Sequence, residues 1–144
     1  MFTILIMSFH SKHLVRNLVK SIDKNIPIVI VENSQDHDLK SKLEREHENV
    51  KVIVPSENLG FAKAVNQGGD VSSGDYIFIL NPDTVIQERT LHVLLNYMMH
   101  NPKVGLCGPK ILNADGSLQI TCKRSFPTPM VALPKILGLS RLFP

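Results

Sequence analysis

The chain alternates short apolar runs with longer amphipathic stretches. Five of the runs are rich in β-branched residues and nearly continuous, which is typical of strands that are covered on both faces. Between them, apolar residues recur at helical spacing. This alternation predicts an α/β fold of Rossmann-like character, with a mostly parallel sheet and helices on both of its faces. The predicted strands are residues 2–8, 26–31, 50–54, 76–80 and 104–107.

Three amphipathic stretches predict helices, over residues 10–22, around 39–43 and over 87–100, where Asn101 and Pro102 end the last one. Near the end of the predicted domain, residues 111–120 predict a hairpin around the turn-rich sequence Asn113-Ala114-Asp115-Gly116. The predicted apolar helix faces are Leu14, Leu18, Val19 and Ile22, then Leu39 and Leu43, then Leu91, Leu94, Leu95 and Met98.

The last residues of the chain differ from the rest in composition. Residues 126–144 hold four of the nine prolines and many apolar side chains, with no evident partner among the other residues. We therefore predict one domain over residues 1–125, followed by an apolar tail over 126–144 that begins a second half. As an alternative, the tail could rest on a membrane surface, with Lys135 and Arg141 near the lipid headgroups.

Charge and cysteine content exclude several classes of protein. The formal net charge of +3 comes from scattered basic residues, which argues against a nucleic acid partner. Cys107 and Cys122 lack the spacing of zinc ligands. The first residues lack the features of a signal peptide, and no apolar run reaches the roughly 20 residues that span a bilayer. We expect a cytoplasmic protein, with the inner face of the membrane as an alternative location.

The first, second and fourth predicted strands end in polar sequences, at residues 8–10, 32–34 and 81–83, and the third strand runs toward residues 57–61. In an open parallel sheet, ligands bind outside the carboxyl ends of the strands, where loops converge. We therefore expect a binding site at this edge of the sheet.

An acidic residue follows the fourth strand. Asp83 could coordinate a hard divalent cation, Mg²⁺ or Mn²⁺, which prefers oxygen ligands and shares its coordination sphere with substrate phosphates. The alternative is structural, because Asn-Pro-Asp-Thr is also a good turn and helix-capping sequence. Glu32 likewise could accept hydrogen bonds from a nucleobase or ribose, or could be a solvated carboxylate at a strand end.

A glycine-containing segment, residues 58–66, follows the third strand. Its sequence is not a Walker loop and does not contain GxGxxG, but Gly60 permits close backbone approach, which suits a nucleotide diphosphate. The alternative is a junction between a loop and a helix, in which Phe61 and Ala64 fill the core.

Taken together, four stretches resemble the inverting, nucleotide-sugar-dependent glycosyltransferases of family two, which have the GT-A fold. They are ILIMSFHS, IVIVENS, NLGFAKAVNQG, and LNPDT followed after a helix by VGLCGPKILNADGSLQ. The segments GPKILNADGS and SFP favour the branch that is similar to rhamnosyltransferases. The resemblance implies that residues 1–125 are the part that binds the donor, a nucleotide-diphosphate sugar.

The resemblance also implies a set of site residues. Asp83 is the implied metal ligand, and Asn81 stands where the first acid of an Asp-x-Asp motif would be. Glu32 departs from the aspartate that is usual in the family. The implied donor-binding residues are Ser8, Glu32, Asn58, Gly60, Asn66 and Asn81.

The implied reaction is an inverting displacement in which a hydroxyl of a polysaccharide or lipid-linked acceptor attacks the anomeric carbon of the donor. No residue of the chain matches the catalytic base of the family, so we expect the base and the acceptor site beyond Pro144. The alternative is a truncated, inactive module that binds a nucleotide sugar. A sugar nucleotidyltransferase is disfavoured, because the first strand lacks a Gly-rich, basic phosphate loop.

Overall fold

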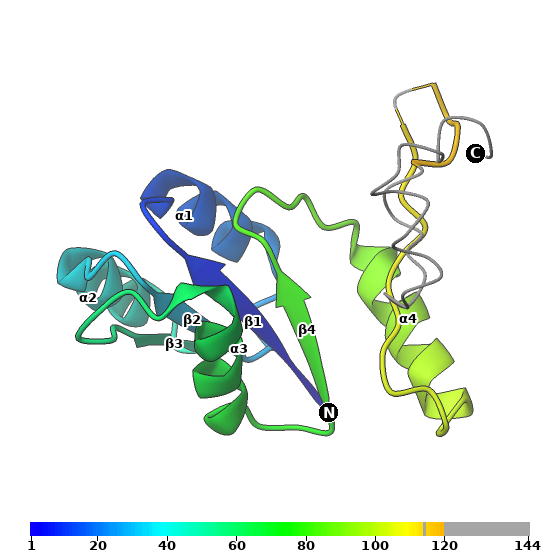
Figure 1. Ribbon diagram of the computed structural model, residues 1–144, viewed down its shortest axis with the longest axis horizontal. Helices are drawn as coiled ribbons and strands as arrows, with labels where there is room; N and C mark the ends of the chain where they lie inside the picture. Colours follow the sequence, from blue (N-terminus) through cyan, green and yellow to red (C-terminus); the bar gives the residue numbers. More distant parts are fainter. Residues whose placement is uncertain (114, 120–144) are drawn as a thin grey trace, which may run out of the picture. The chain divides into compact units, whose positions relative to one another are not determined.

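A computed structural model describes residues 1–113 and 115–119 of the chain. Strands and helices alternate over the first hundred residues, as the apolar pattern predicts (Figure 1). The elements are β1 (Phe2–Ser8), α1 (Lys12–Ser21), β2 (Ile28–Glu32), α2 (His37–Glu46), β3 (Val50–Ile53), α3 (Gly60–Asp70), β4 (Tyr76–Leu80) and α4 (Glu88–His100).

The four strands form one parallel sheet in the order β3-β2-β1-β4. β1 lies at the centre, where Ser8 is paired with Glu32 of β2 and Ile6 with Leu80 of β4. Because the strands are parallel, the segments that follow β1, β2 and β4 all leave from the same edge of the sheet. The mostly parallel α/β fold predicted from the sequence is confirmed.

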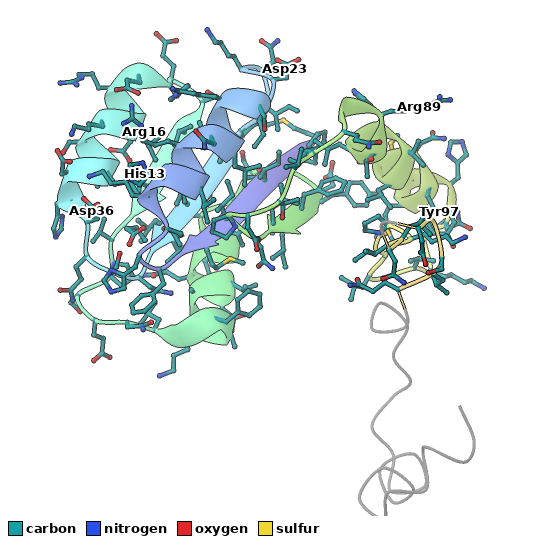
Figure 2. The ribbon with its side chains drawn as sticks, turned by 90° about the horizontal axis from the view of Figure 1, so that it is seen from above. His13, Arg16, Asp23, Asp36, Arg89 and Tyr97 are labelled. Carbon is teal, nitrogen blue, oxygen red and sulfur yellow. The ribbon has the colours of Figure 1, made fainter. Side chains whose placement is uncertain are left out.

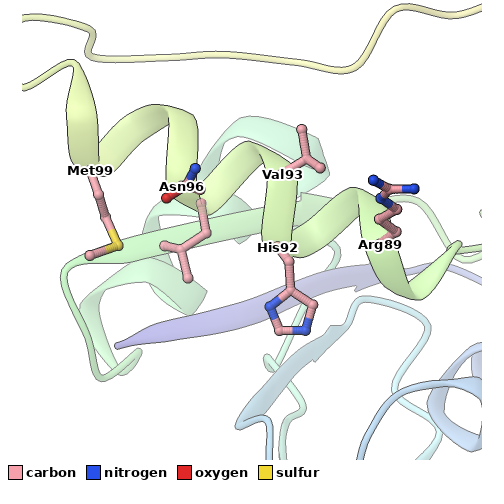
Figure 3. A pocket seen from close by; sticks show the side chains of 6 residues that line it. Arg89, His92, Val93, Asn96 and Met99 are labelled. Atoms are coloured by element: carbon pink, nitrogen blue, oxygen red, sulfur yellow. The ribbon is translucent and has the colours of Figure 1, made fainter.

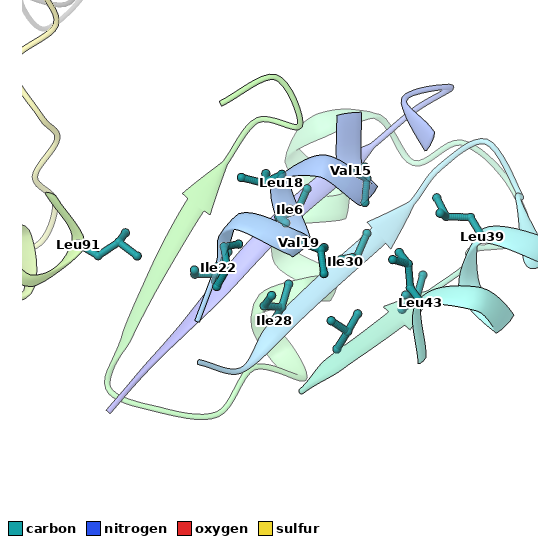
Figure 4. Close-up of a cluster of buried hydrophobic side chains, with 13 residues drawn as sticks. Ile6, Val15, Leu18, Val19, Ile22, Ile28, Ile30, Leu39, Leu43 and Leu91 are labelled. Carbon is teal, nitrogen blue, oxygen red and sulfur yellow. The ribbon is translucent and has the colours of Figure 1, made fainter. Parts of the chain in front are cut away.

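Alternate residues of the strands enter two separate hydrophobic clusters. Ile4 and Ile6 of β1 pack with α1 and α2, whereas Leu5 and Met7 pack with Ala64 of α3. Seen from above, α1 and α2 (blue and cyan) lie on one side of the strands and α3 (green) on the other (Figure 2). The larger cluster, drawn in Figure 4, contains Ile4, Ile6, Val15, Leu18, Val19, Ile22, Ile28, Ile30, Leu39, Leu43, Val50, Val52 and Leu91.

One predicted core position, Leu14, is wrong, and so is the placement of Phe61 in the core under the alternative interpretation of residues 58–66. In α1, Val15 is buried whereas Leu14 is 46% exposed, because positions 15, 18, 19 and 22 form the stripe that faces the sheet. In α3, Ala64 is buried but Phe61 is 60% exposed. The faces predicted for the other two helices are confirmed, since Leu39, Leu43 and Leu91 are buried and the remaining three positions of α4 are partly buried.

The fifth predicted strand, residues 104–107, is not a strand. Leu106 is 87% exposed, and the segment pairs with no other part of residues 1–113 and 115–119. Among the described residues of the predicted hairpin, Leu112 and Leu118 form an antiparallel bridge. It is flanked by hydrogen bonds from the Asn113 N–H to the Ser117 carbonyl, at 2.8 Å, and from the Gln119 N–H to the Ile111 carbonyl, at 3.0 Å.

The chain divides after Val104 into two units, residues 1–104 and 105–144. The predicted boundary at residue 125 and the apolar tail over 126–144 lie outside the described residues. None of the helices in the described part of the chain is long and apolar enough to cross a membrane.

Side chains of α2 cover the free border of β3. The Val52 N–H donates to Glu44 Oε1 at 2.8 Å, and the Val52 carbonyl accepts a hydrogen bond from Lys40 Nζ. Lys40 and Glu44 also form an ion pair at 3.0 Å. Both hydrogen-bonding groups that β3 presents at Val52 are therefore satisfied by α2.

Ion pairs join α1 to α2 on the surface. Lys12 lies 3.2 Å from Asp36 and 2.7 Å from Asp38, and Lys42 contacts Asp38 at 2.9 Å. Asp36 also caps α2, since its Oδ1 atom accepts the Leu39 N–H at 2.8 Å. The two helices that cover one face of the sheet are thus tied together at the amino end of α2.

Candidate functional site

Two of the predicted site residues lie side by side where β1 and β2 end. Ser8 and Glu32 are paired across the parallel ladder, and each is only 1% exposed. Ser8 Oγ is 3.0 Å from Ser11 Oγ, and the Ser8 carbonyl accepts the Asn33 N–H at 2.8 Å. The carboxyl edge of the sheet therefore carries a buried acid beside a buried hydroxyl.

The two oxygen atoms of the Glu32 carboxylate have different surroundings. Oε1 accepts hydrogen bonds from the Ser34 N–H, at 2.8 Å, and from the Ser34 hydroxyl. Oε2 is also buried but has no hydrogen-bond partner among the described residues. A buried acceptor without a partner costs free energy, roughly 1–3 kcal/mol, which a ligand that donates a hydrogen bond would recover. The interpretation of Glu32 as a solvated carboxylate is thus wrong.

The loop before α3 is held to the same edge. Asn33, which is 6% exposed, accepts the Leu59 N–H at 3.4 Å through its Oδ1 atom. The Asn58 side chain accepts the Gly60 N–H at 2.9 Å, and Gly60 has a φ of +68°. These contacts bring the start of α3, with its partial positive charge, to the ends of β1 and β2.

Asn81 and Asp83 follow β4 at the same edge of the sheet. Both are exposed, and the Thr84 N–H donates to the Asn81 carbonyl at 3.1 Å, so the predicted turn is present. No hydrogen bond or ion pair joins Asp83 to Glu32 or Gly60 within residues 1–113 and 115–119. The structure therefore places Asp83 on the expected edge, without a hydrogen bond or ion pair to Glu32.

The described side chains could hold a divalent cation only if a bound molecule supplied further ligands. Among the described residues there is no group of three or more His, Cys, Asp or Glu side chains that could hold a metal ion. Asp83 is exposed and makes no ion pair within that part of the chain. One accessible carboxylate suits Mg²⁺ or Mn²⁺ when phosphate oxygens supply further ligands.

Asn66 is not brought to the strand ends. It lies six residues after Gly60, or about 9 Å along the helix axis. It is exposed and lines a groove between α3 and the middle of the sheet, together with Leu5, Val65, Gly69, Asp70, Ile77 and Ile79. A second hollow lies along α4 and is lined by Arg89, His92, Val93, Leu95, Asn96 and Met99, none of which was predicted as a site residue (Figure 3).

Comparison with known proteins now decides the family. Residues 3–134 match the protein family described as Glycosyl transferase family 2. The chain belongs to glycosyltransferase family 2. The match includes β1 from its second residue, β2 to β4, and the segments that carry all seven predicted donor-binding and metal residues.

Individual members of family 2 share the same region. The chain is 30% identical over 105 residues to the poly-beta-1,6-N-acetyl-D-glucosamine synthase of Staphylococcus aureus strain COL, covering 70% of the chain and 25% of that relative. It is 27% identical over 147 residues to the low-salt glycan biosynthesis hexosyltransferase Agl10 of Haloferax volcanii, covering 99% of the chain and 45% of the relative. The chain thus spans less than half the length of either protein.

A solved structure shares the fold of this family 2 chain. The structure of S. aureus TarS residues 1-349 superimposes with a TM-score of 0.57 at 19% identity, over 70% of the chain and 33% of that structure. At this identity the likeness shows the fold alone, and it confirms the GT-A-like arrangement predicted from the sequence.

Three further residues lie at this edge but are not in the set of donor-binding residues that the resemblance implies. Asn33 and Ser34 make the contacts described above, and the His10 N–H donates to Ser34 Oγ at 3.2 Å. His10 has a φ of +51°, a conformation that few non-glycine residues adopt. In the sequence, the run Glu-Asn-Ser at the end of an apolar stretch is the feature that indicates Asn33 and Ser34 as site residues.

Proposed function

We propose that this chain is the donor-binding part of a family 2 glycosyltransferase. The donor is a nucleotide-diphosphate sugar, and the acceptor is a polysaccharide or a lipid-linked glycan. The two relatives whose names concern poly-N-acetylglucosamine synthesis and glycan biosynthesis support a glycan product. The similarity of GPKILNADGS to rhamnosyltransferases supports rhamnose as the transferred sugar.

The observation that carries this proposal is the unpartnered Oε2 atom of Glu32. It is buried at the carboxyl edge of a parallel sheet, beside Ser8 and close to the loop that begins α3. A nucleoside offers N–H and O–H donors that such an acceptor would bind. Once shielded from water, a hydrogen bond to a carboxylate contributes about 1.5–3 kcal/mol.

The diphosphate of the donor belongs at the start of α3. The first backbone N–H groups of a helix have no partner within the helix and point toward the edge from which the helix starts. Asn58 and the positive φ of Gly60 fix how the chain enters that first turn. The nucleoside and the diphosphate would then lie on adjacent parts of one edge.

Asp83 would hold the divalent cation together with the diphosphate oxygens. The cation, when bound, supplies positive charge that stabilises the diphosphate as a leaving group. The residues described here bind and orient the donor, so that an acceptor hydroxyl meets the anomeric carbon in line with the departing diphosphate. We place the catalytic base in a second half of the enzyme, beyond residue 144.

Calorimetric titration of the chain with UDP, dTDP and their sugars, with and without Mn²⁺, tests this function. We expect saturable binding that Mn²⁺ strengthens. Glu32→Ala should weaken binding of every nucleotide about tenfold or more, corresponding to at least about 1.4 kcal/mol. Asp83→Ala should remove only the part of the binding that depends on Mn²⁺.

A matched control is Glu48→Gln, because Glu48 is exposed and precedes β3 at the opposite edge of the sheet. This variant should bind like the wild type. Absence of binding across the whole nucleotide panel would contradict the proposed donor site.

A further inference from the structure

We infer that Ser34 is a positioning residue for the donor nucleotide: it holds one oxygen of the Glu32 carboxylate, so that the other oxygen alone is presented to the ligand. This inference rests on the proposed function, since it names a residue of the same site. Ser34 lies two residues after the end of β2 and was not among the residues predicted to bind donor.

Ser34 contacts the Glu32 carboxylate with two donors. Its N–H and its hydroxyl both donate to Oε1, and neither reaches Oε2. With two hydrogen bonds on one oxygen, rotation of the carboxyl group about its last bond would break both contacts. Intermediate orientations of the carboxyl group are therefore disfavoured, and one oxygen, Oε2 here, is left as the acceptor without a partner.

The length of the glutamate side chain makes this restraint necessary. Glutamate has one more rotatable bond than aspartate, so an unrestrained carboxylate at this position would sample more orientations. Fixing those rotamers only when ligand binds would cost conformational entropy. Ser34 orders the side chain beforehand and so lowers the cost of binding.

The same hydroxyl reaches the strand on the other side of Glu32. Ser34 Oγ accepts the His10 N–H at 3.2 Å, just after the end of β1, where His10 has its positive φ. One hydroxyl thus donates to the acid and accepts from the loop between β1 and α1. Loss of the hydroxyl would leave the carboxylate with a single hydrogen bond, from the N–H of residue 34, and would release the His10 N–H.

A double-mutant cycle between Ser34 and Glu32 tests the inference, with calorimetric titration of UDP and dTDP as the measurement. Ser34→Ala should weaken binding about 3- to 10-fold, the range for one lost hydrogen bond. In the Glu32→Ala background, the same change should have less than a twofold effect, because the carboxylate it restrains is gone. Ser34→Thr keeps the hydroxyl and should restore binding to within about twofold. The matched control is Ser41→Ala, an exposed serine of α2.

Amide hydrogen exchange gives a readout that needs no ligand. Exchange of the His10 amide should become faster in Ser34→Ala and remain unchanged in Ser34→Thr, while core amides of β1 stay protected in both. Unchanged His10 exchange in Ser34→Ala, or an equal loss of affinity with and without Glu32, would overturn the role of Ser34. A wild-type chain that binds no nucleotide would instead overturn the proposed function, and the exchange data would still decide whether the Ser34 hydroxyl accepts the His10 N–H.

Discussion

A Cβ atom on Gly68 would stand 2.3 Å from Leu5 Cδ1, because α3 lies directly against the centre of β1 at this point. It would also stand 3.1 Å from Val31 Cγ2. Both neighbours are buried and belong to the cluster that α3 covers. The position of the helix that begins at the candidate site therefore depends on the absence of a side chain at Gly68.

Gly68→Ala should destabilise the fold by about 1–3 kcal/mol through overpacking, measured by urea denaturation. Gly69→Ala is the matched control one residue later. Its Cβ would meet only Ile77 Cδ1, at 3.8 Å, so it should stabilise α3 by about 0.5–1 kcal/mol. Equal effects of the two substitutions would contradict the close packing.

Gly60→Ala should destabilise the chain by about 1–2 kcal/mol for a different reason. No atom lies within 4 Å of the position that a Cβ would take at Gly60, but its φ of +68° is unfavourable for alanine. Gly60→Asn should cost less, since asparagine tolerates this conformation better. Thermal denaturation of the two variants would distinguish backbone strain from a steric clash.

Asp36→Ala should cost about 1 kcal/mol of stability, because Asp36 caps α2 through the Leu39 N–H. Asp36→Asn keeps an oxygen acceptor at the cap but removes the charge that faces Lys12. If the capping hydrogen bond contributes more stability than the ion pair, denaturant titration should show Asp36→Asn to be nearly as stable as the wild type. An equal loss in both variants would assign the effect to the ion pair.

Asp38 should make stability fall at acid pH. Hydrogen bonds from Lys12 and Lys42 lower the pKa of the Asp38 carboxyl from 3.8 to about 2. Because the folded-state pKa lies below the unfolded one, this contribution is complete above about pH 4 and disappears as the pH falls toward 2. The Tm of the wild type should therefore decrease more steeply between pH 4 and 2 than the Tm of Asp38→Asn. Parallel curves for the two proteins would contradict this assignment.

The sequence predicted the strands well where continuous apolar runs are bounded by polar residues. The bounds of β1 and β4 agree at both ends, because hydrophobic burial on two faces leaves a pattern that can be read locally. Residues 104–107 are also apolar, but a strand requires hydrogen bonds from a neighbour, and apolar character alone does not reveal whether one is present.

Helix orientation was predicted less well than helix position. Leu14 and Val15 are adjacent residues that lie 100° apart around α1, so a small rotation decides which one is buried. In α3, the residues that face the sheet are the small Ala64 and Gly68, whereas the larger Phe61 is exposed. Hydrophobicity alone does not reveal which of these residues contacts the sheet.

For the candidate site, the sequence predicted the edge of the sheet and the acid, but not the hydrogen bonds. Glu32 follows from its place after an apolar run. The links from Ser34 to His10 and from Asn33 to Leu59 join residues 24 and 26 positions apart, and they exist only once the strands are paired. Such contacts leave no periodic pattern in the sequence.

The covering of β3 by α2 has a consequence for how molecules of this protein meet one another. An uncovered border strand is a template on which a second molecule can add its own strand, and this is a common start of aggregation. At Val52 the backbone N–H and carbonyl are already hydrogen-bonded to Glu44 and Lys40, so they are not available to the backbone of an incoming strand. Substitution of either Glu44 or Lys40 would leave one backbone group of Val52 without its partner, open to the strand of a second molecule.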